Sequence, residues 1–418
     1  MNVGIIGSGG REHAICVSIK QSNKAKNIFC LPGNAGTQNI ANNIKVNIDD
    51  FEEIRGIVKN KKIDLLIIGP EQPLVNGIVD FFENENVLVF GPNKICSQLE
   101  GSKIFTKKIC QEYKIPTSKF GIFQNKKDSI VYVSKCKFPL VVKADGLAAG
   151  KGVYICEDLA FAENAINEIF DGKFGKAENI LVEEFLVGEE MSFFIISDGK
   201  NIINFQTAQD HKRVLEGDKG KNTGGMGAYS PSRLDNPNLE KKIMNKIIYP
   251  TLKAIENLGT RYLGFLYAGL MIIKDEPYLI EYNVRMGDPE CQTILPRLNT
   301  DLLDIILDSC KGRLAHEVQW KSEKSLCVVL CSKGYPDQYE NKIIKNLDKI
   351  KIENNNYIFH AGTTYKNDKI FSSGGRVLNF VTLSDNFKTS RNNNLNLIKD
   401  LNWDNGFCRS DIGYKVID

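Results

Sequence analysis

The first hundred residues alternate short apolar runs with helix-like segments, and this alternation constrains the fold more than any other feature of the chain. The runs at 3–6, 28–31, 65–68 and 87–90 each have the length of a β-strand and are bounded by Gly or Pro. Strands separated by helical segments pair as a parallel sheet with helical crossovers. We therefore predict an N-terminal doubly wound parallel α/β domain that binds ligands at the carboxyl edge of its sheet.

Composition and charge exclude several classes of protein. A chain of 418 residues is too long for one ordinary domain, and 42% hydrophobic with 25% charged residues is typical of a globular enzyme. The net charge is only +3, so the basic surface that nucleic acid binding requires is missing. The eleven cysteines are odd in number and scattered, so we expect reduced, mostly buried thiols.

The N-terminus and the hydropathy pattern bear on location. The chain enters its first apolar run directly, without the basic and long apolar regions of a signal peptide. No run reaches the roughly 18 apolar residues that a membrane-spanning helix needs. We therefore expect a cytoplasmic protein with no membrane partner.

A glycine-rich turn at 7–13 follows the first predicted strand. Such a turn exposes backbone N–H groups at the start of a helix, where an anionic phosphate is favoured. A dinucleotide-binding loop is an alternative, but His13 stands near the position of the third glycine that this motif requires. The glycines could also serve only to turn the chain. Polar loops at 32–37 and 69–71 follow later strands, so a phosphate-and-ribose pocket is expected at this edge.

A second glycine-rich loop follows a strand that ends in Lys143. The loop contains Gly146, Gly150 and Gly152. A cation beside a flexible glycine loop is suited to hold a phosphate and fold backbone over it, so we predict a phosphate-binding flap. The loop is not a Walker A motif, because no Gly-Lys-Ser/Thr follows the glycines. Lys103 is a second candidate cation, although either lysine could instead be an ordinary surface charge.

The segment 180–190 reads as a strand that runs into an extended linker with acidic residues at both ends. Backbone groups of such a linker can recognise adenine, and a carboxylate seven residues further on can accept both ribose hydroxyl protons. The alternative is that these acids belong to a solvated surface.

The most informative group of polar residues lies on the segment 278–289. Side chains two residues apart share one face of a strand, so Glu281, Asn283 and Arg285 are predicted to form one polar wall. Two oxygen ligands suit Mg²⁺, and an arginine can grip a carboxylate or phosphate with two hydrogen bonds. The alternative is an exposed antiparallel surface.

Together these motifs resemble the glycinamide ribonucleotide synthetase family of the ATP-grasp superfamily. The similarity is collinear along nearly the whole chain and includes the segments 7–13, 91–94, 98–103, 143–152, 209–213, 222–231, 287–290, 360–363, 374–377 and 408–413. The glycine flap alone indicates only an ATP-grasp protein, whereas the string at 222–231 and the order of all the motifs indicate this family.

The resemblance implies a fold and domain boundaries. These are an N-terminal α/β domain at 1–101 that binds phosphoribosylamine, an ATP-grasp domain at 102–325, and a C-terminal β-rich domain at 326–418. A small lid subdomain at about 120–188 would belong to the ATP-grasp domain.

The resemblance also implies functional residues. Catalytic roles fall to Arg285, Lys143, Asp210 and Lys212. Contacts to ATP fall to Lys103, Lys143, Gly150, Gly152, Glu183, Glu184, Phe185, Leu186 and Glu190. Substrate contacts fall to Gly9, Gly10, Arg11, Glu71, Asp210, Arg213, Gly225 and Arg285. The metal ligands would be Glu281 and Asn283. The stretch 267–271 lacks a further carboxylate that many ATP-grasp relatives carry, so the number of bound metal ions stays open.

The implied activity is ligation of glycine to 5-phosphoribosylamine with ATP and Mg²⁺ or Mn²⁺, through glycyl phosphate, in de novo purine biosynthesis. The products would be glycinamide ribonucleotide, ADP and phosphate, and the protein would be a monomer or a weak homodimer. The alternatives are another ATP-grasp carboxylate–amine ligase, a non-catalytic nucleotide-binding module and an NAD-dependent oxidoreductase built on the first domain.

Overall fold

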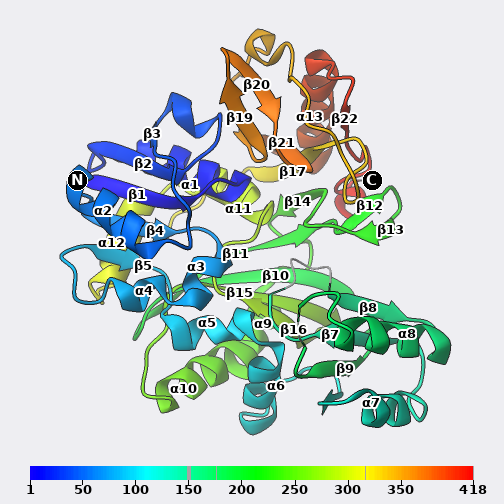
Figure 1. Cartoon of the computed structure of the whole chain (residues 1–418). Coiled ribbons are helices and arrows are strands. Elements are labelled where there is room, and N and C mark those ends of the chain that lie inside the picture. Colours follow the sequence, from blue (N-terminus) through cyan, green and yellow to red (C-terminus); the bar gives the residue numbers. More distant parts are fainter. Residues whose placement is uncertain (148–151, 176, 316, 418) are drawn as a thin grey trace.

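The N-terminal part of the chain is a parallel α/β unit. The computed structural model describes residues 1–147, 152–175, 177–315 and 317–417, and this unit is drawn in blue in Figure 1. Its strands are β1 (Asn2–Gly7), β2 (Asn27–Pro32), β3 (Asn42–Asn43), β4 (Leu65–Ile68) and β5 (Leu88–Phe90). They pair in the order β3-β2-β1-β4-β5, and every pairing is parallel. The predicted parallel sheet is confirmed.

Helices follow the strands of this sheet. They are α1 (Gly10–Lys20), η1 (Thr37–Asn39), α2 (Phe51–Lys61), α3 (Glu71–Asn76), α4 (Ile78–Phe81) and α5 (Lys94–Gly101). The central strands consist almost wholly of buried apolar residues, as expected when helices cover both faces of a parallel sheet. Helices α1 and α3 begin directly after β1 and β4, so Arg11 and Glu71 lie at the carboxyl edge of the sheet.

A small antiparallel unit projects from the remainder of the molecule (Figure 1). Helix α6 (Lys103–Glu112) precedes it, and its own elements are β6 (Phe120–Phe123), α7 (Lys126–Val133), β7 (Leu140–Ala144), β8 (Val153–Cys156), α8 (Leu159–Phe170) and β9 (Ile180–Glu184). The strands pair antiparallel in the order β6-β9-β7-β8. Both helices pack on this sheet in a separate hydrophobic core. Lys143 therefore stands on a middle strand of the unit, opposite Leu181 of β9.

The central part carries a long antiparallel sheet. Its elements are β10 (Glu189–Asp198), β11 (Ile202–Asp210), β12 (Arg213–Leu215), β13 (Lys219–Asn222), β14 (Gly227–Ser230), α9 (Pro237–Ile243), the π-helical turn η2 (Met244–Ile248), α10 (Tyr249–Asn257), β15 (Leu263–Ile273), β16 (Glu276–Asn283), α11 (Glu290–Ile294), η3 (Leu295–Arg297) and α12 (Leu302–Cys310). Strands β12 and β13 form a separate two-stranded hairpin.

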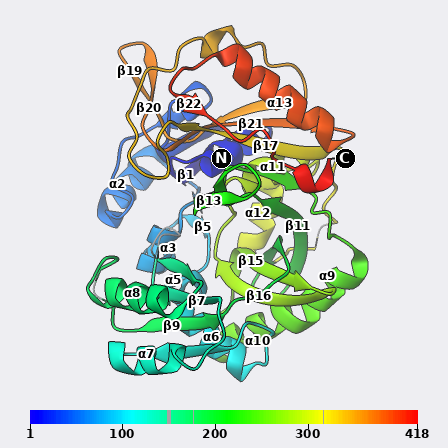
Figure 2. The ribbon, with the colours of Figure 1, turned by 90° about the vertical axis from the view of Figure 1, so that its right-hand side faces the viewer.

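The C-terminal part continues this sheet. Its elements are β17 (Lys324–Ser332), η4 (Leu347–Lys349), β18 (Asn356–His360), β19 (Thr363–Lys366), β20 (Lys369–Ser372), β21 (Arg376–Ser384), α13 (Phe387–Leu401), β22 (Gly406–Phe407) and η5 (Tyr414–Val416). Because β14 pairs with β17, the strands run in the order β16-β15-β10-β11-β14-β17-β21-β18, with β22 added at β17. Figure 2 shows α13 lying along β17 and β21.

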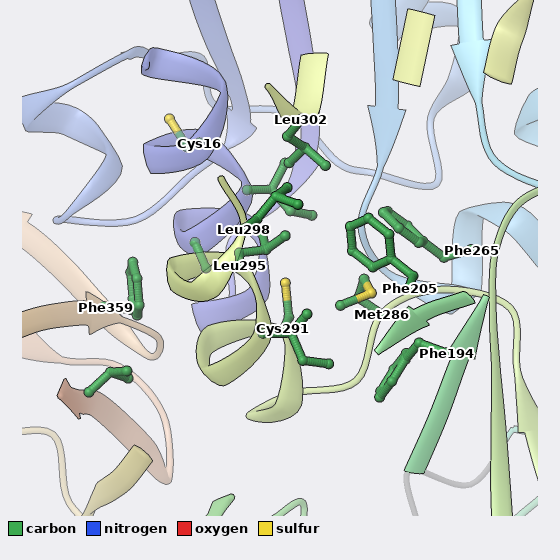
Figure 3. Close-up of a cluster of buried hydrophobic side chains, with 14 of the residues drawn as sticks. Cys16, Phe194, Phe205, Phe265, Met286, Cys291, Leu295, Leu298, Leu302 and Phe359 are labelled. Carbon is green, nitrogen blue, oxygen red and sulfur yellow. The ribbon is translucent and has the colours of Figure 1, made fainter. Parts of the chain in front are cut away.

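A hydrophobic core joins the N-terminal unit to the central sheet. Cys16 of α1 belongs to the same cluster as Cys291 and Leu295 of the segment that begins with α11 (Figure 3). The aromatic rings of Phe194 and Phe265 cover the other side of this segment. Helix α1 is therefore packed firmly against the central part, which fixes the position of the glycine turn at its start. No helix in the described ranges is both long enough and apolar enough to cross a membrane.

Candidate active site

One cavity of about 710 Å³ lies where these parts meet. Most of the residues expected to be functional lie on its wall, namely Arg11, Glu71, Lys103, Lys143, Gly152, Glu183, Glu184, Phe185, Leu186, Glu190, Asp210, Lys212, Arg213, Glu281, Asn283 and Arg285. Three others, Gly9, Gly10 and Gly225, are not among the described wall residues. Gly150 lies outside the described residues. Residues that are far apart in sequence are thus brought to one volume of the size of a nucleotide site.

Lys143 is buried in an ion cluster. Its ammonium and that of Lys107 both pair with the carboxylate of Glu183, and the side chains of all three are less than a tenth exposed. Ser118 donates a further hydrogen bond to Glu183 at 2.8 Å. Burial by itself would raise the pKa of the Glu183 carboxyl, but Lys143 and Lys107 together lower it to about 2. The carboxylate of Glu183 therefore fixes the flap lysine, and only its backbone is free to meet an adenine.

Lys103 lies at the start of α6 and faces the same volume. Its ammonium donates to the carbonyl oxygen of Gly146 at 2.8 Å. Ser102 caps the helix by accepting from the N–H of Phe105, and it also contacts Asp145 at 3.2 Å. Both candidate phosphate lysines therefore lie beside the described base of the glycine loop.

The linker between β9 and β10 has no regular structure from 185 to 188 and lines the cavity. Glu190, on β10, accepts a hydrogen bond from Lys212 at 2.8 Å, and Lys212 is the main cause of the lowered pKa of Glu190. Asp210 stands at the end of β11, and burial raises the pKa of its carboxyl to about 7 against the opposing effect of Lys212. The linker is therefore flanked by two acidic side chains, Glu190 and Asp210, and by the basic side chain of Lys212.

Glu281 and Asn283 present their side-chain oxygens to the cavity from β16. The strand has a bulge opposite Gly269 and Leu270, so the regular alternation of faces breaks at Ile280 and resumes at Glu281. Neither the Glu281 carboxylate nor the Asn283 amide has a hydrogen-bond partner among the described residues. Within those residues no cluster of three or more His, Cys, Asp or Glu could hold a metal by itself. The pair fits Mg²⁺, which takes one or two protein oxygens and completes its shell with phosphate and water.

Arg285 lies in the bend just after β16 and joins two other parts of the molecule. Its guanidinium donates to Glu71 of the N-terminal unit at 3.2 Å and to Glu100 of α5 at 2.6 Å. Burial raises the pKa of Glu100 to about 7, whereas Arg285 lowers the pKa of Glu71 to about 2. A third contact, to the carbonyl oxygen of Met286, is longer at 3.3 Å. A ligand carboxylate would therefore most easily replace the longer contacts of Arg285, those to Glu71 and Met286.

The glycine turn at the start of α1 differs from the expectation drawn from the sequence. Two of its N–H groups are not free for a phosphate, because the N–H of Gly9 donates to the Glu12 carboxylate at 2.6 Å and the N–H of Arg11 donates to Asp288 at 3.1 Å. The guanidinium of Arg11 also contacts Glu12 at 3.1 Å and the carbonyl oxygen of Gly69 at 2.8 Å. Glu12, three residues after Gly9, thus supplies an anion from within the chain.

Gly10 and Gly225, two of the three glycines that lie off the cavity wall, have packing roles. A Cβ on Gly10 would lie 2.4 Å from Nε2 of Gln292 and 2.5 Å from Nδ2 of Asn379, so only glycine lets the three parts of the chain meet here. Gly225 has φ of +115°, and a Cβ there would lie 2.6 Å from Cδ of Pro289. Any contact of these glycines with a substrate stays a prediction.

Seven charged wall residues were given no role by the reasoning from sequence. They are Glu100, Lys107, Asp218, Asp288, Glu290, Arg376 and Lys415. Lys107 had a usable signal, since it lies one helical turn after Lys103. Glu100, Asp288 and Arg376 stand within motifs of the family resemblance, but their partners come from other domains. Arg376, for example, donates to the carbonyl oxygens of Gly224 at 2.7 Å and Asp288 at 2.6 Å.

Three family models together match most of the chain. The models described as the phosphoribosylglycinamide synthetase N domain, ATP-grasp (A) domain and C domain match residues 1–100, 101–291 and 325–415. A phosphoribosylamine–glycine ligase of Brucella melitensis is 43% identical over 421 residues, which cover 100% of this chain and 99% of that protein.

Solved structures agree with this match. A phosphoribosylamine–glycine ligase of Thermotoga maritima has a TM-score of 0.86 and 31% identity, and the alignment covers 99% of this chain and 100% of that one. The biotin carboxylase domain of a Hydrogenobacter thermophilus 2-oxoglutarate carboxylase, solved with MgADP and bicarbonate, has a TM-score of 0.73 at 16% identity. It covers 95% of this chain and 89% of its own, and shows similarity of fold only.

Proposed function

The chain belongs to the phosphoribosylglycinamide synthetase family, and from that premise we propose how its cavity carries out the reaction. It catalyses the ATP-dependent ligation of glycine to 5-phosphoribosylamine in purine biosynthesis. The single observation that carries the assignment of the site is that one cavity gathers the buried Lys143, the half-buried Lys103, a pair of unpartnered oxygen donors and Arg285.

Activation of glycine has to come first. An amine does not displace oxygen from a carboxylate at neutral pH, so the carboxylate takes the γ-phosphoryl group of ATP and becomes glycyl phosphate, with release of ADP. The amino group of phosphoribosylamine then attacks the acyl carbon, phosphate leaves, and the nitrogen loses a proton. Phosphoryl transfer of this kind depends on in-line positioning and charge neutralisation, and it requires no protein nucleophile.

The nucleotide site is proposed to lie between the lid and the central sheet. Lys103 and Lys143 neutralise the phosphates, and the backbone from Glu183 through Leu186 recognises adenine. Glu190 accepts hydrogen bonds from the ribose hydroxyls. Its carboxylate would then bind both the ligand and Lys212. The support for this arrangement is that all of these residues face one cavity and that Glu183 holds Lys143 in place.

The family uses ATP with a divalent metal, and we propose Mg²⁺ or Mn²⁺ held by Glu281 and Asn283. A divalent ion held there would neutralise phosphate charge during phosphoryl transfer. The chain contributes the orientation of the two oxygens, which β16 presents beside Lys103.

Glycine is proposed to bind at Arg285, and phosphoribosylamine between the N-terminal unit and the acceptor loop. The carboxylate of glycine takes guanidinium N–H groups that now make the longer contacts, from Nε to Glu71 and from Nη1 to Met286. Arg11, Glu71, Asp210 and Arg213 line the space on the acceptor side. These sites would then be distributed over three domains, at 1–101, 102–325 and 326–418, with a lid at about 120–188 in the second.

The experiment that tests this assignment replaces Arg285 by Lys. The charge stays, but the forked pair of hydrogen bonds that orients the glycine carboxylate is lost. We expect ADP affinity, measured by calorimetry, to stay within about threefold of wild type, and glycine-dependent ADP release to fall by about a hundredfold. Wild-type glycine kinetics, or loss of nucleotide binding, would show that this arginine has another role.

The closest competing function is another ATP-grasp ligation, since the nucleotide machinery is shared. Replacing glycine by alanine or serine in the same assay distinguishes the two, because only glycine is expected to support ADP release.

A further inference from the structure

The last described residues of the chain return to the central cavity. The turn η5 spans Tyr414–Val416, and Lys415 is one of the wall residues. We propose that Lys415 is a ligand-binding residue whose ammonium contacts a phosphate group of a bound substrate. The inference rests on the proposed function, because it takes the cavity to be the site of the nucleotide and the phosphosugar.

The segment that carries Lys415 is anchored by a buried arginine. The side chain of Arg409 is 2% exposed and makes two hydrogen bonds to Asp411, at 2.7 and 2.8 Å. It also donates to Asp218 at 2.8 Å and to the carbonyl oxygen of Arg213 at 2.9 Å. These partners belong to the hairpin of β12 and β13, so the C-terminal segment and the acceptor loop are fixed to each other.

Contacts closer to Lys415 continue the same attachment. The N–H of Gly413 donates to Nε2 of His211 at 3.2 Å, and the hydroxyl of Tyr414 donates to Asp218 at 2.8 Å. The two residues before Lys415 are therefore held by hydrogen bonds to the segment 211–218. The ammonium of Lys415 lies 5.6 Å from the ring centroid of Tyr414, over its face. The position of this cation is thus set by the fold and not by a free chain end.

The ammonium of Lys415 makes weaker contacts with the protein than those of Lys103 and Lys212. Lys103 donates to a carbonyl oxygen at 2.8 Å, and Lys212 to a carboxylate at 2.8 Å. The nearest carboxylate oxygen to Lys415 belongs to Asp218, at 3.9 Å, and Asp218 already accepts from Arg409 and Tyr414. The Lys415 ammonium donates no hydrogen bond to any part of the chain that the structure describes. A cation in this state is available to an anionic ligand.

The position of Lys415 relative to the other charges indicates the kind of ligand. It is one of the cations that lower the pKa of Glu190, after Lys212. It therefore acts on the part of the cavity where the ribose of the nucleotide is proposed to lie. A lysine binds phosphate as a compact point charge, without the geometric demands of a guanidinium. Both the nucleotide and phosphoribosylamine carry phosphate, and the experiment has to distinguish them.

The test compares Lys415→Ala and Lys415→Arg with the wild-type protein. Calorimetry gives the dissociation constant of ADP in the presence of Mg²⁺, and steady-state assays give the KM for phosphoribosylamine. The matched control is Lys399→Ala, an exposed lysine of α13 in the same part of the chain. Thermal unfolding without ligand shows whether any variant is destabilised.

We expect Lys415→Ala to weaken one phosphate ligand by about tenfold and Lys415→Arg to restore it to within about threefold. Weaker ADP binding assigns the contact to the nucleotide. A raised KM for phosphoribosylamine with unchanged ADP binding assigns it to the phosphosugar. Unchanged values for both, or a loss in ligand-free unfolding temperature that accounts for the weaker binding, would overturn the proposal. Absence of glycine-dependent turnover in the wild type would refute the proposed function instead, while the ADP measurement would still test Lys415.

Discussion

The guanidinium of Arg285 donates to one oxygen of Glu100 at 2.6 Å, and the other oxygen of Glu100 accepts from the backbone N–H of Val284 at 2.8 Å. One carboxylate therefore fixes both the side chain of Arg285 and the backbone beside it. Glu100 comes from α5, directly before the helix that begins at Lys103. The contact links the proposed glycine site at Arg285 to the proposed phosphate site at Lys103 through the short backbone segment between α5 and α6.

Replacing Glu100 by Gln should lower glycine-dependent kcat/KM by about tenfold and leave ADP affinity unchanged, because the amide holds the guanidinium less firmly. The effect should depend on pH. Burial raises the pKa of Glu100 to about 7, so the wild-type residue is mainly a neutral acid at pH 6 and mainly a carboxylate at pH 8. The two proteins should therefore differ more at pH 8 than at pH 6. A constant ratio between pH 6 and 8 would show that Glu100 does not position Arg285 through its charge.

Replacing Glu183 by Gln should destabilise the protein by about 3 kcal/mol at pH 7, because two buried ammonium groups lose their carboxylate. The folded pKa of Glu183, about 2, lies below its ordinary value. Its contribution is therefore fully present above about pH 4.5 and is lost as the pH falls toward 2. Denaturant unfolding as a function of pH should show a shallower acid limb in the variant. Exposed Glu178, just before β9, provides Glu178→Gln as the control, and an equal change in that control would contradict the buried-pair account.

Replacing Glu281 by Gln should remove the Mg²⁺ dependence of nucleotide binding. We expect ADP to bind about tenfold more weakly than in the wild type when Mg²⁺ is present, and equally when a chelator removes it. Glu276→Gln is the control, since Glu276 stands on the same strand but pairs with Lys242 and Lys246 away from the cavity. If Glu281→Gln and Glu276→Gln keep the same response to Mg²⁺, the metal is held elsewhere.

The sequence predicts best those features that depend on neighbouring residues. Apolar runs gave the parallel sheet, and the spacing of Glu281 and Asn283 gave their common face, although the bulge at Ile280 could not be read from it. Charged pairs between residues far apart in the sequence could not be predicted from it. Nothing local shows that Lys107 shares Glu183 with Lys143, because the three residues come from α6, β9 and β7.

The glycine turn at the start of α1 illustrates the same limit. Its pattern indicates free N–H groups, yet Asp288, which accepts from Arg11, lies 277 positions further along the chain. Whether Glu12 or a ligand phosphate occupies the turn depends on packing between domains.

The most direct test of the account measures ADP release by the purified protein with MgATP, leaving out glycine and phosphoribosylamine in turn. The account predicts rapid ADP release, matched mole for mole by glycinamide ribonucleotide, only when both substrates are present, and a rate lower by about a hundredfold or more when either is omitted. Equal ADP release without glycine, or release without formation of the amide product, would contradict it.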